Sequence, residues 1–414
     1  MIDSSLKNMA NIAIVTPFGA EERLDVFAEF IAAKGLSERG HKVRMYTYRI
    51  RSNPDYVVVK KNYKGVSVTR CTQRLGISPR LFWDLLVSRP NVVILCHIRS
   101  WLSLPAYIAA RLIGAKVLFQ VVGLLHDPHV VEDRDNPLET IRPNITMIHS
   151  FGGLVVSILK TSRLLSCWEN YAFHTPLYRA DERIVITEFE QRTLKQVSGL
   201  GSIVIPWGVP SHAEGGVERE PLTQQGAPIA PGFLLYIGQV KKRKGWDTII
   251  EALAVLRSRG INRNLVFVTS SGPEEFTNAK NLVKELGVED LVIFLFKISN
   301  EEKQWLYSHA KATLAPSRYE GFGLTVFESF VARVPVLGTD IPVYDEFLVD
   351  GETGLVSCKG DPETLAQNIL RLDDTDLVAK IVAGGTRMAG IYSAENVVER
   401  FDLAVQTAVA PAAN

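Results

Sequence analysis

Short apolar runs alternate with amphipathic stretches along almost the whole chain of 414 residues. The run at 12–15 has the length and composition of a buried strand, the stretch 23–38 has helical periodicity, and another apolar run follows at 43–48. Strands that alternate with helices in this way predict βαβ units on a parallel sheet. The sequence therefore predicts an α/β protein with doubly wound parallel sheets.

One break divides this alternation. Residues 207–232 include nine glycines or prolines and have no periodicity, which is typical of a linker. Near the end of the chain, 393–407 has the pattern of an amphipathic helix with Ser393 as its N-cap. Two domains joined in this way would face each other across a cleft, with ligands at the carboxyl ends of the strands. The predicted order is an N-terminal domain at 1–210, the linker at 211–232, a C-terminal domain at 233–390 and a final helical segment at 391–414.

Both domains contain further predicted elements of the same kind. In the first, helices are predicted at 81–88 and 105–112, and strands at 92–95, 116–122, 184–186 and 203–205. In the second, helices are predicted at 246–259, 279–286, 301–309 and 323–332, and strands at 233–237, 265–269, 292–296, 313–315 and 334–337.

Composition excludes several classes of protein. Hydrophobic residues make up 46% and charged residues 22% of the chain, which argues against disorder. No apolar run approaches the ~18 residues that a membrane span needs. The N-terminus carries Asp3 and lacks a signal-type apolar core, so we expect a cytoplasmic protein that starts at Met1 or Met9. Scattered cysteines favour neither disulfides nor a zinc site: Cys71, Cys96, Cys167 and Cys358.

The net charge of +1 conceals an asymmetry. Residues 1–212 hold 26 basic and 18 acidic side chains, net +8, so 213–414 hold the remaining 20 and 27, net −7. We expect the basic half to meet an anionic membrane surface, and we expect no nucleic-acid partner. The segments 78–90 and 151–165 mix apolar and basic residues, and each fits either an interfacial helix or a buried one.

The stretch 316–330, PSRYEGFGLTVFESF, is the richest in functional signals. Gly321 and Gly323 allow the backbone to approach a ligand closely. A helix that starts near Gly323 leaves the amides of Phe322, Gly323 and Leu324 free to bind an anion such as phosphate. A glycine-rich turn without a ligand fits the glycines alone equally well.

Two glutamates sharpen that interpretation. Glu320 precedes the predicted helix and Glu328 lies inside it, and a carboxylate can accept two hydrogen bonds from a sugar or ribose diol. SRYEGFGLTVFES resembles the E-x7-E signature of retaining GT-B glycosyltransferases of glycosyltransferase family 4 (glycosyl transferases group 1). The resemblance implies the GT-B fold, in which two Rossmann-like domains face each other across a cleft.

Six further stretches resemble the same family, in the family's order. They span most of the chain, and the last resembles the helix that in that family packs back on the first domain. They are 180–194, 204–210, GQVKKRKGW at 238–246, the strand and glycine turn from 267 that include Gly272, 333–356, and YSAENVVERF at 392–401.

The resemblance implies roles for the signature residues. Glu328 would hold the ribose hydroxyls of a nucleotide diphosphate sugar. Glu320 would contact hydroxyls of the transferred sugar, positioned together with the amides of Phe322, Gly323 and Leu324. Thr325 would line the same donor site, at a position where proline is common in the family.

The basic loop 238–246 would bind the donor's diphosphate. Lys244 would neutralise charge that develops on the leaving group, and the resemblance adds Gly238, Gln239 and Arg243 as donor contacts. Taken alone, a charge run such as Lys241–Lys244 is more often a solvated loop. Gln239 departs from the family, where arginine gives bidentate phosphate contact that glutamine cannot.

Histidines and a glycine mark the first domain. His97 and His126 each follow a predicted strand, and a lone histidine in such a place is more often structural. Similar enzymes place a histidine at the second position beside the donor sugar, so we expect His126 to be catalytic with Glu320 and Lys244. His97 and Asp127 are expected on the acceptor side. Gly19 matches a glycine loop near the diphosphate.

The resemblance implies a retaining reaction by same-face attack, moving a hexose-type sugar from a nucleotide diphosphate sugar to a glycan, lipid-linked or other acceptor. We expect no metal and no other cofactor, because two DxD matches, at 133–135 and 374–376, lie in polar loops where chance explains them. Two alternatives stay open. One is a non-catalytic nucleotide-sugar-binding or membrane-docking module, and the other is a GT-B nucleotide-sugar epimerase.

Overall fold

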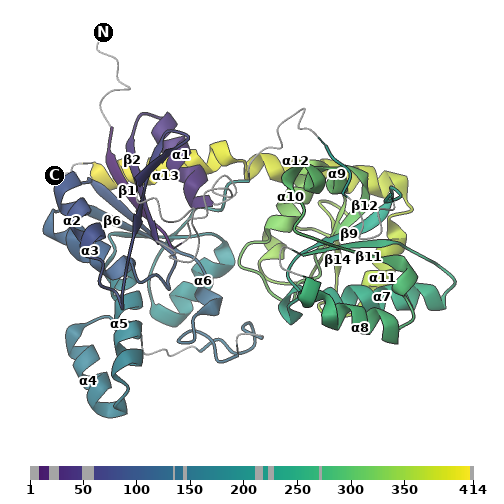
Figure 1. Cartoon of the computed structure of the whole chain (residues 1–414), viewed down its shortest axis with the longest axis horizontal. Coiled ribbons are helices and arrows are strands. Elements are labelled where there is room, and N and C mark those ends of the chain that lie inside the picture. The colour runs from purple at the N-terminus through teal and green to yellow at the C-terminus, as the bar shows by residue number, and fades with distance from the viewer. Residues whose placement is uncertain are drawn as a thin grey trace, which may run out of the picture. The chain divides into compact units, whose positions relative to one another are not determined.

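The structure is a computed structural model, and it describes residues 9–17, 28–48, 60–133, 136–142, 147–209, 218–221, 228–269 and 273–410. Two compact units make up the chain (Figure 1). Unit 1 comprises Met1–Pro210 together with Ser393–Asn414, and unit 2 comprises Ser211–Tyr392. Each unit has its own sheet and its own buried core.

The described part of unit 1 contains an eight-stranded sheet of order β3-β4-β2-β1-β5-β6-β7-β8. Its neighbouring strands are parallel except for β3, which runs antiparallel to β4. The strands are β1 (Asn11–Val15), β2 (Lys42–Tyr48), β3 (Lys60–Tyr63), β4 (Val66–Cys71), β5 (Val92–Cys96), β6 (Lys116–Val121), β7 (Glu182–Val185) and β8 (Ile203–Val204). The helices are α1 (Ala28–Glu38), α2 (Pro79–Ser88), α3 (Ser103–Leu112), the short η4 (Leu124–His126), α4 (Phe151–Thr161), α5 (Leu164–Arg179), α6 (Glu188–Ser198) and α13 (Ala394–Val409).

The last helix, α13, packs on the core of unit 1. Val397, Phe401 and Val405 are spaced four residues apart, so they lie on one face and join the cluster that includes Ile12 and Phe30. Ser393 accepts a hydrogen bond from the Asn396 amide at 3.4 Å, which confirms the predicted N-cap. The end of the chain therefore belongs to the same compact unit as its beginning.

Unit 2 has a parallel sheet of order β11-β10-β9-β12-β13-β14 among its described residues. Its strands are β9 (Phe233–Ile237), β10 (Leu265–Thr269), β11 (Val292–Phe296), β12 (Ala310–Leu314), β13 (Val336–Thr339) and β14 (Leu355–Ser357). Its α-helices are α7 (Trp246–Ser258), α8 (Thr277–Glu285), α9 (Asn300–His309), α10 (Leu324–Ala332), α11 (Pro362–Arg371) and α12 (Thr375–Ile391). The expected α/β class with two doubly wound domains is confirmed, with one antiparallel edge strand in unit 1 as an addition.

One predicted strand has a different start in the structure, and one hairpin of the structure was not predicted. The strand predicted at 334–337 begins instead at Val336, because Arg333 ends α10 in the left-handed region and Val334 donates its amide to the Ser329 carbonyl at 3.0 Å. The β3–β4 hairpin has no counterpart among the predictions, since KKNYKGVSVTRC is polar and carries little apolar alternation. Among the described residues, no helix is both long and apolar enough to cross a membrane.

Candidate functional site

The signature loop connects β12 to α10 in unit 2. Gly323 is the N-cap of α10 with φ of 99°, a left-handed conformation that strains other residues. A side chain there would also collide with Tyr344, because a Cβ would lie 2.7 Å from its ring. Phe322 is buried and stacks on Phe327 with ring centroids 4.8 Å apart, so its side chain belongs to the core. Only the backbone of residues 322 and 323 is suited to meet a ligand.

Glu320 is a buried carboxylate surrounded by cations. Its Oε1 accepts hydrogen bonds from Lys244 Nζ and from the Ser317 hydroxyl, the latter at 2.7 Å, and its Oε2 lies 3.7 Å from the Arg243 guanidinium. Burial alone would raise the pKa of Glu320, but Lys244, Arg243 and Ser317 lower it below its ordinary value. The side chain is therefore held as a carboxylate at neutral pH.

The basic loop is fixed against the signature loop. The Arg318 amide donates to the Arg243 carbonyl at 2.7 Å. Gly245 has φ of 65°, and a Cβ there would lie 1.8 Å from the Pro316 carbonyl oxygen, so this close approach requires glycine. Asp247 receives hydrogen bonds from Lys242 at 2.8 Å and Arg318 at 2.7 Å, which ties the loops a second time.

The start of the basic loop is equally constrained. Gly238 donates its amide to the Val268 carbonyl at 3.0 Å, and Tyr236 donates its hydroxyl to the Gln239 carbonyl at 2.8 Å. The Gln239 side-chain oxygen accepts from Arg243 at 3.4 Å. The structure thus brings Gln239, Arg243 and Lys244 of the basic loop together with Glu320, which lies 76 residues after Lys244.

Glu328 is bound from a helix that sequence reasoning did not connect to it. Lys303 Nζ lies 2.7 Å from one carboxylate oxygen of Glu328, and the Tyr307 hydroxyl donates to the other at 2.8 Å. Burial, together with the neighbouring Glu328 charge, raises the pKa of Tyr307, so its hydroxyl stays protonated. Lys303 and Tyr307 are spaced four apart on α9, which puts them on one helix face. This i, i+4 spacing is the feature of the sequence from which the shared contact with Glu328 could have been predicted.

The remaining residues predicted to bind the donor are Leu324, Thr325, Gly19 and Gly272. Leu324 and Thr325 open α10, the first exposed and the second half-buried. The carbonyl of Thr325 accepts a hydrogen bond from Ser329 at 2.9 Å. Gly19 and Gly272 lie outside the described residues.

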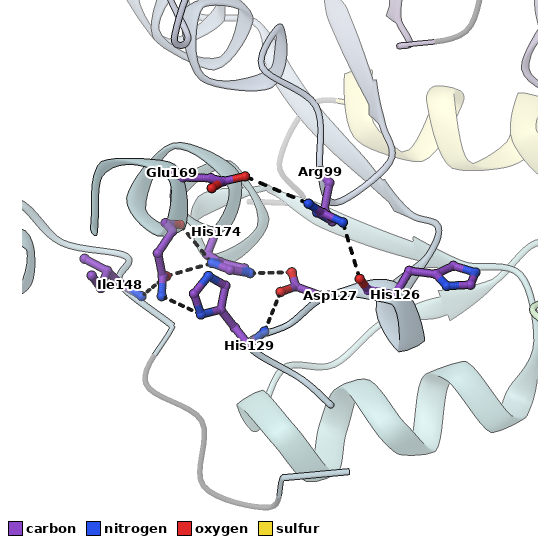
Figure 2. A network of polar contacts seen from close by, with 8 residues as sticks. Arg99, His126, Asp127, His129, Ile148, Glu169 and His174 are labelled. Carbon is purple, nitrogen blue, oxygen red and sulfur yellow. Dashed lines mark hydrogen bonds and ion pairs between the residues drawn. The ribbon is translucent and has the colours of Figure 1, made fainter. Parts of the chain in front are cut away.

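Unit 1 contains a second buried polar network, drawn in Figure 2. His174 Nε2 lies 2.9 Å from Asp127 Oδ2, and both side chains are fully buried. The other His174 nitrogen lies 2.8 Å from the Asn170 carbonyl oxygen, so both ring nitrogens face acceptors. A ring that carries both protons satisfies them, which makes this a buried ion pair.

Neighbouring contacts fix the protonation of that network. The Ile148 amide donates to Asn170 Oδ1 at 2.7 Å, so the Asn170 amide nitrogen faces His129 Nδ1 at 3.1 Å. His129 therefore accepts there, and burial lowers its pKa, which agrees with a neutral ring. Burial opposes ionisation of Asp127, yet the hydrogen bond and charge of His174 lower the pKa of that carboxyl.

His126 joins this network through its carbonyl, which accepts a hydrogen bond from Arg99 at 3.5 Å. It ends η4, its side chain is exposed, and its ring is directed away from Asp127 and His174 (Figure 2). Asp127 was expected on the acceptor side, but its side chain is buried and receives the amide of His129 at 2.8 Å. It has no exposed surface for an acceptor and instead fixes the turn that follows His126.

His97 and Asp374 of the second DxD match each contact another described residue. His97 has a positive φ of 70° and its Nε2 lies 2.6 Å from Glu29 of α1, a buried partner that sequence reasoning missed. Asp374 caps α12 by accepting the amides of Asp376 and Leu377. Asp135 lies outside the described residues.

Comparison with known structures decides the fold. A glycosyltransferase from Rickettsia africae ESF-5 superposes with a TM-score of 0.69 at 17% identity, covering 98% of this chain and 100% of that one. Anabaena Alr3699/HepE, solved in complex with UDP-glucose, gives a TM-score of 0.65 at 15% identity over 96% and 100% of the two chains. The chain has the GT-B fold. Sequence identities this low support a shared fold but carry no conclusion about activity.

The match to a family model lies within unit 2. Residues 220–384 match the family model described as Glycosyl transferases group 1. The D-inositol 3-phosphate glycosyltransferase of Acidothermus cellulolyticus is 32% identical over 181 residues, which are 42% of this chain and 40% of that protein. The match thus spans less than half the length of that relative. The family-model match at 220–384 contains both glutamates of the signature and the basic loop.

Proposed function

We propose that this GT-B protein is a retaining glycosyltransferase that transfers a hexose-type sugar from a nucleotide diphosphate sugar. The observation that carries the proposal is Glu320, a buried carboxylate held ionised between Lys244, Arg243 and Ser317. Relatives support the same class, since the matched family is Glycosyl transferases group 1 and the Anabaena neighbour was solved with UDP-glucose.

Donor binding would exchange partners within this cluster. A diphosphate that arrives at the basic loop competes for Lys244 and Arg243, and their withdrawal frees lone pairs on Glu320. Those lone pairs then accept hydrogen bonds from the hydroxyls of the sugar. Glu328, already bound by Lys303 and Tyr307, keeps further lone pairs for the ribose diol.

The reaction would be a same-face displacement without metal. The acceptor oxygen forms a bond to the anomeric carbon as the bond from that carbon to the diphosphate oxygen breaks. The leaving diphosphate takes the acceptor's proton, and its growing charge is stabilised by Lys244 and Arg243. His126, exposed at the end of η4, is kept in this proposal as a catalytic residue. Unit 1 would bind the acceptor at the cytosolic face of a membrane. The acceptor would be a glycan, a lipid-linked sugar or another hydroxyl compound.

Gln239 replaces the arginine of the family, and a second arginine lies beside it. The Arg243 guanidinium contacts the Gln239 side chain and lies 5.6 Å from the centre of the Tyr319 ring. It is close to Glu320 as well. Arg243 therefore supplies a guanidinium beside the position where the family has its arginine, which favours a catalytic protein over a non-catalytic binding module.

A donor screen tests the proposal. We expect one or a few of the UDP-, GDP-, ADP- and TDP-sugars to stabilise the protein against heat and to give free nucleotide diphosphate only when an acceptor is present. The product should retain the donor's anomeric configuration by NMR, and excess chelator should leave the rate unchanged. Inversion, nucleotide release without acceptor, interconversion of sugars, or a rate that only manganese restores would each contradict part of the proposal.

A further inference from the structure

The α4–α5 hairpin projects from the sheet of unit 1 (Figure 1). One face of α4 is closed, because Leu154 and Ile158 pack against Cys167, Trp168 and Tyr171. The sequence left open whether 151–165 is buried or interfacial. Among the described residues of unit 1, Leu154 is the one buried residue of α4, so the helix is not enclosed by them.

Other positions of α4 expose large apolar side chains. Leu159 is 78% exposed, and Phe151, Val155 and Val156 lie open on the same helix. Leu164 and Leu165 continue the exposure at the start of α5, where Leu165 is 65% exposed. Single exposed apolar residues are ordinary, but a contiguous group of this kind marks an interaction surface.

A second exposed apolar turn lies beside the start of α5. Trp168 of α5 donates its indole N–H to the Leu75 carbonyl at 2.8 Å, which fixes the 74–77 turn against the hairpin. Leu75 and Ile77 of that turn are exposed. Two segments distant in sequence thus form one surface, called here the tip surface: Phe151, Val155, Val156, Leu159, Leu164 and Leu165 with Leu75 and Ile77.

The charged side chains within the segments of the tip surface are basic. Lys160 and Arg163 are exposed at the end of α4, and Arg74 and Arg80 are exposed around the turn. The sequences 147–168 and 72–83 contain no aspartate or glutamate. Glu169 and Asp84 follow them directly, and each lies 3.9 Å from an arginine, Arg99 and Arg80 respectively. An apolar face with Arg74, Lys160 and Arg163 at its border is complementary to an anionic lipid bilayer, in which apolar side chains enter the acyl boundary and cations meet headgroups.

We propose that the tip surface docks the protein on an anionic lipid bilayer. The inference builds on the proposed function, since it specifies how a membrane-bound acceptor is reached. It differs from that function in its test, because docking requires no turnover. Insertion is shallow, as expected for side chains on a helix that lies in the interface plane.

Flotation of the full chain with vesicles tests the proposal. We expect binding at low salt to vesicles of phosphatidylcholine with added phosphatidylglycerol, little binding to phosphatidylcholine alone, and release at high salt. Leu165→Glu should lower partitioning about tenfold, because it places a charge where an apolar group inserts. Lys160→Glu with Arg163→Glu should lower it by about tenfold or more.

Matched controls separate the tip surface from the rest of the molecule. Leu403 of α13 is also 65% exposed, so Leu403→Glu is the control for Leu165→Glu, and Lys195→Glu on α6 is the control for the charge reversals. Both controls should float like the wild type. All variants should keep the wild-type urea midpoint and the wild-type rate on a water-soluble acceptor.

Three results would overturn the docking proposal. They are no vesicle binding at low salt, equal loss in the tip and control variants, and a concentration-dependent dimer in sedimentation that Leu165→Glu abolishes without vesicle binding. The last would assign the tip surface to a second copy of the chain. Turnover without flotation would refute docking alone, and flotation without turnover would refute the proposed function alone.

Discussion

Glu320 and Asp127 are both buried carboxylates with basic partners, but the exposure of those partners differs. Glu320 of unit 2 contacts Lys244 and Arg243, whose side chains remain 21% and 19% exposed. Asp127 of unit 1 contacts His174, whose side chain is 0% exposed. A ligand can reach the cations of Glu320 and exchange with them, whereas none can reach His174. Burial of a charged acid therefore does not identify a ligand site by itself, because a ligand can exchange only with partners that are exposed.

Substitution of Glu320 gives the largest expected effect on turnover. Glu320→Gln keeps the shape and the Ser317 contact but removes the charge that orients Lys244 and the sugar. We expect the rate to fall about 100-fold or more, as for other losses of transition-state contacts. Steady-state kinetics with the donor found by the screen measures it.

Glu363→Gln is the control for that substitution, because Glu363 pairs with Arg259 on the surface of the same unit. Its rate should match the wild type. If Glu320→Gln turned over normally while it bound the donor, Glu320 would be as structural as Asp127, and the contrast between the two acids would fail.

Substitution of Asp127 should act on stability. Asp127→Asn leaves His174 buried without a counter-charge, and removal of one partner from a buried pair costs about 3–5 kcal/mol. Urea unfolding measures this loss. Glu188→Gln, which breaks an exposed pair with Arg192, should cost less than about 1 kcal/mol. An Asp127→Asn protein as stable as the wild type would show that the pair contributes little to folding.

Acid unfolding should report the same pair. An unfolded aspartate titrates near 3.9, at about the model peptide value. The folded pKa of Asp127 is lower, so its contribution to stability is present above about pH 3.9 and is lost as pH falls through the folded value. The unfolding free energy of the wild type should fall with pH in that range, and the slope should be smaller in Asp127→Asn. Equal slopes would exclude Asp127 as a source of the acid sensitivity.

The fold was largely predictable because its periodicity is local. Apolar runs such as 233–237 and 265–269 matched β9 and β10, and Gly323 marked the start of α10. The β3–β4 hairpin was not predictable in this way, since Lys60 and Lys61 mask its strand pattern at the sheet edge. Edge strands often carry such lysines, which protect against pairing with other chains.

The candidate site was predictable only in part. Motif spacing found Glu320, Glu328 and Lys244, whose roles await experiment. Their partners depend on contacts between segments distant in sequence, such as Lys303 to Glu328. Asp127 shows the converse limit, because its sequence neighbour His126 is exposed while its spatial partner His174 lies 47 residues away.

Substitution of Arg243 should have the smallest of the predicted effects, and it tests whether both exposed cations beside Glu320 bind the donor. Arg243→Lys keeps a cation near Glu320 but loses the planar fork that can contact a diphosphate at two points. We expect the KM for the donor to rise roughly tenfold, since hydrogen bonds to charged groups are worth about 1.5–3 kcal/mol, with a smaller change in kcat. The double variant Arg243→Lys with Gln239→Arg should recover part of that loss, because it returns a guanidinium to the neighbouring position. An unchanged KM in Arg243→Lys would mean that Lys244 alone holds the diphosphate, and the accessible cations of Glu320 would then reduce to one.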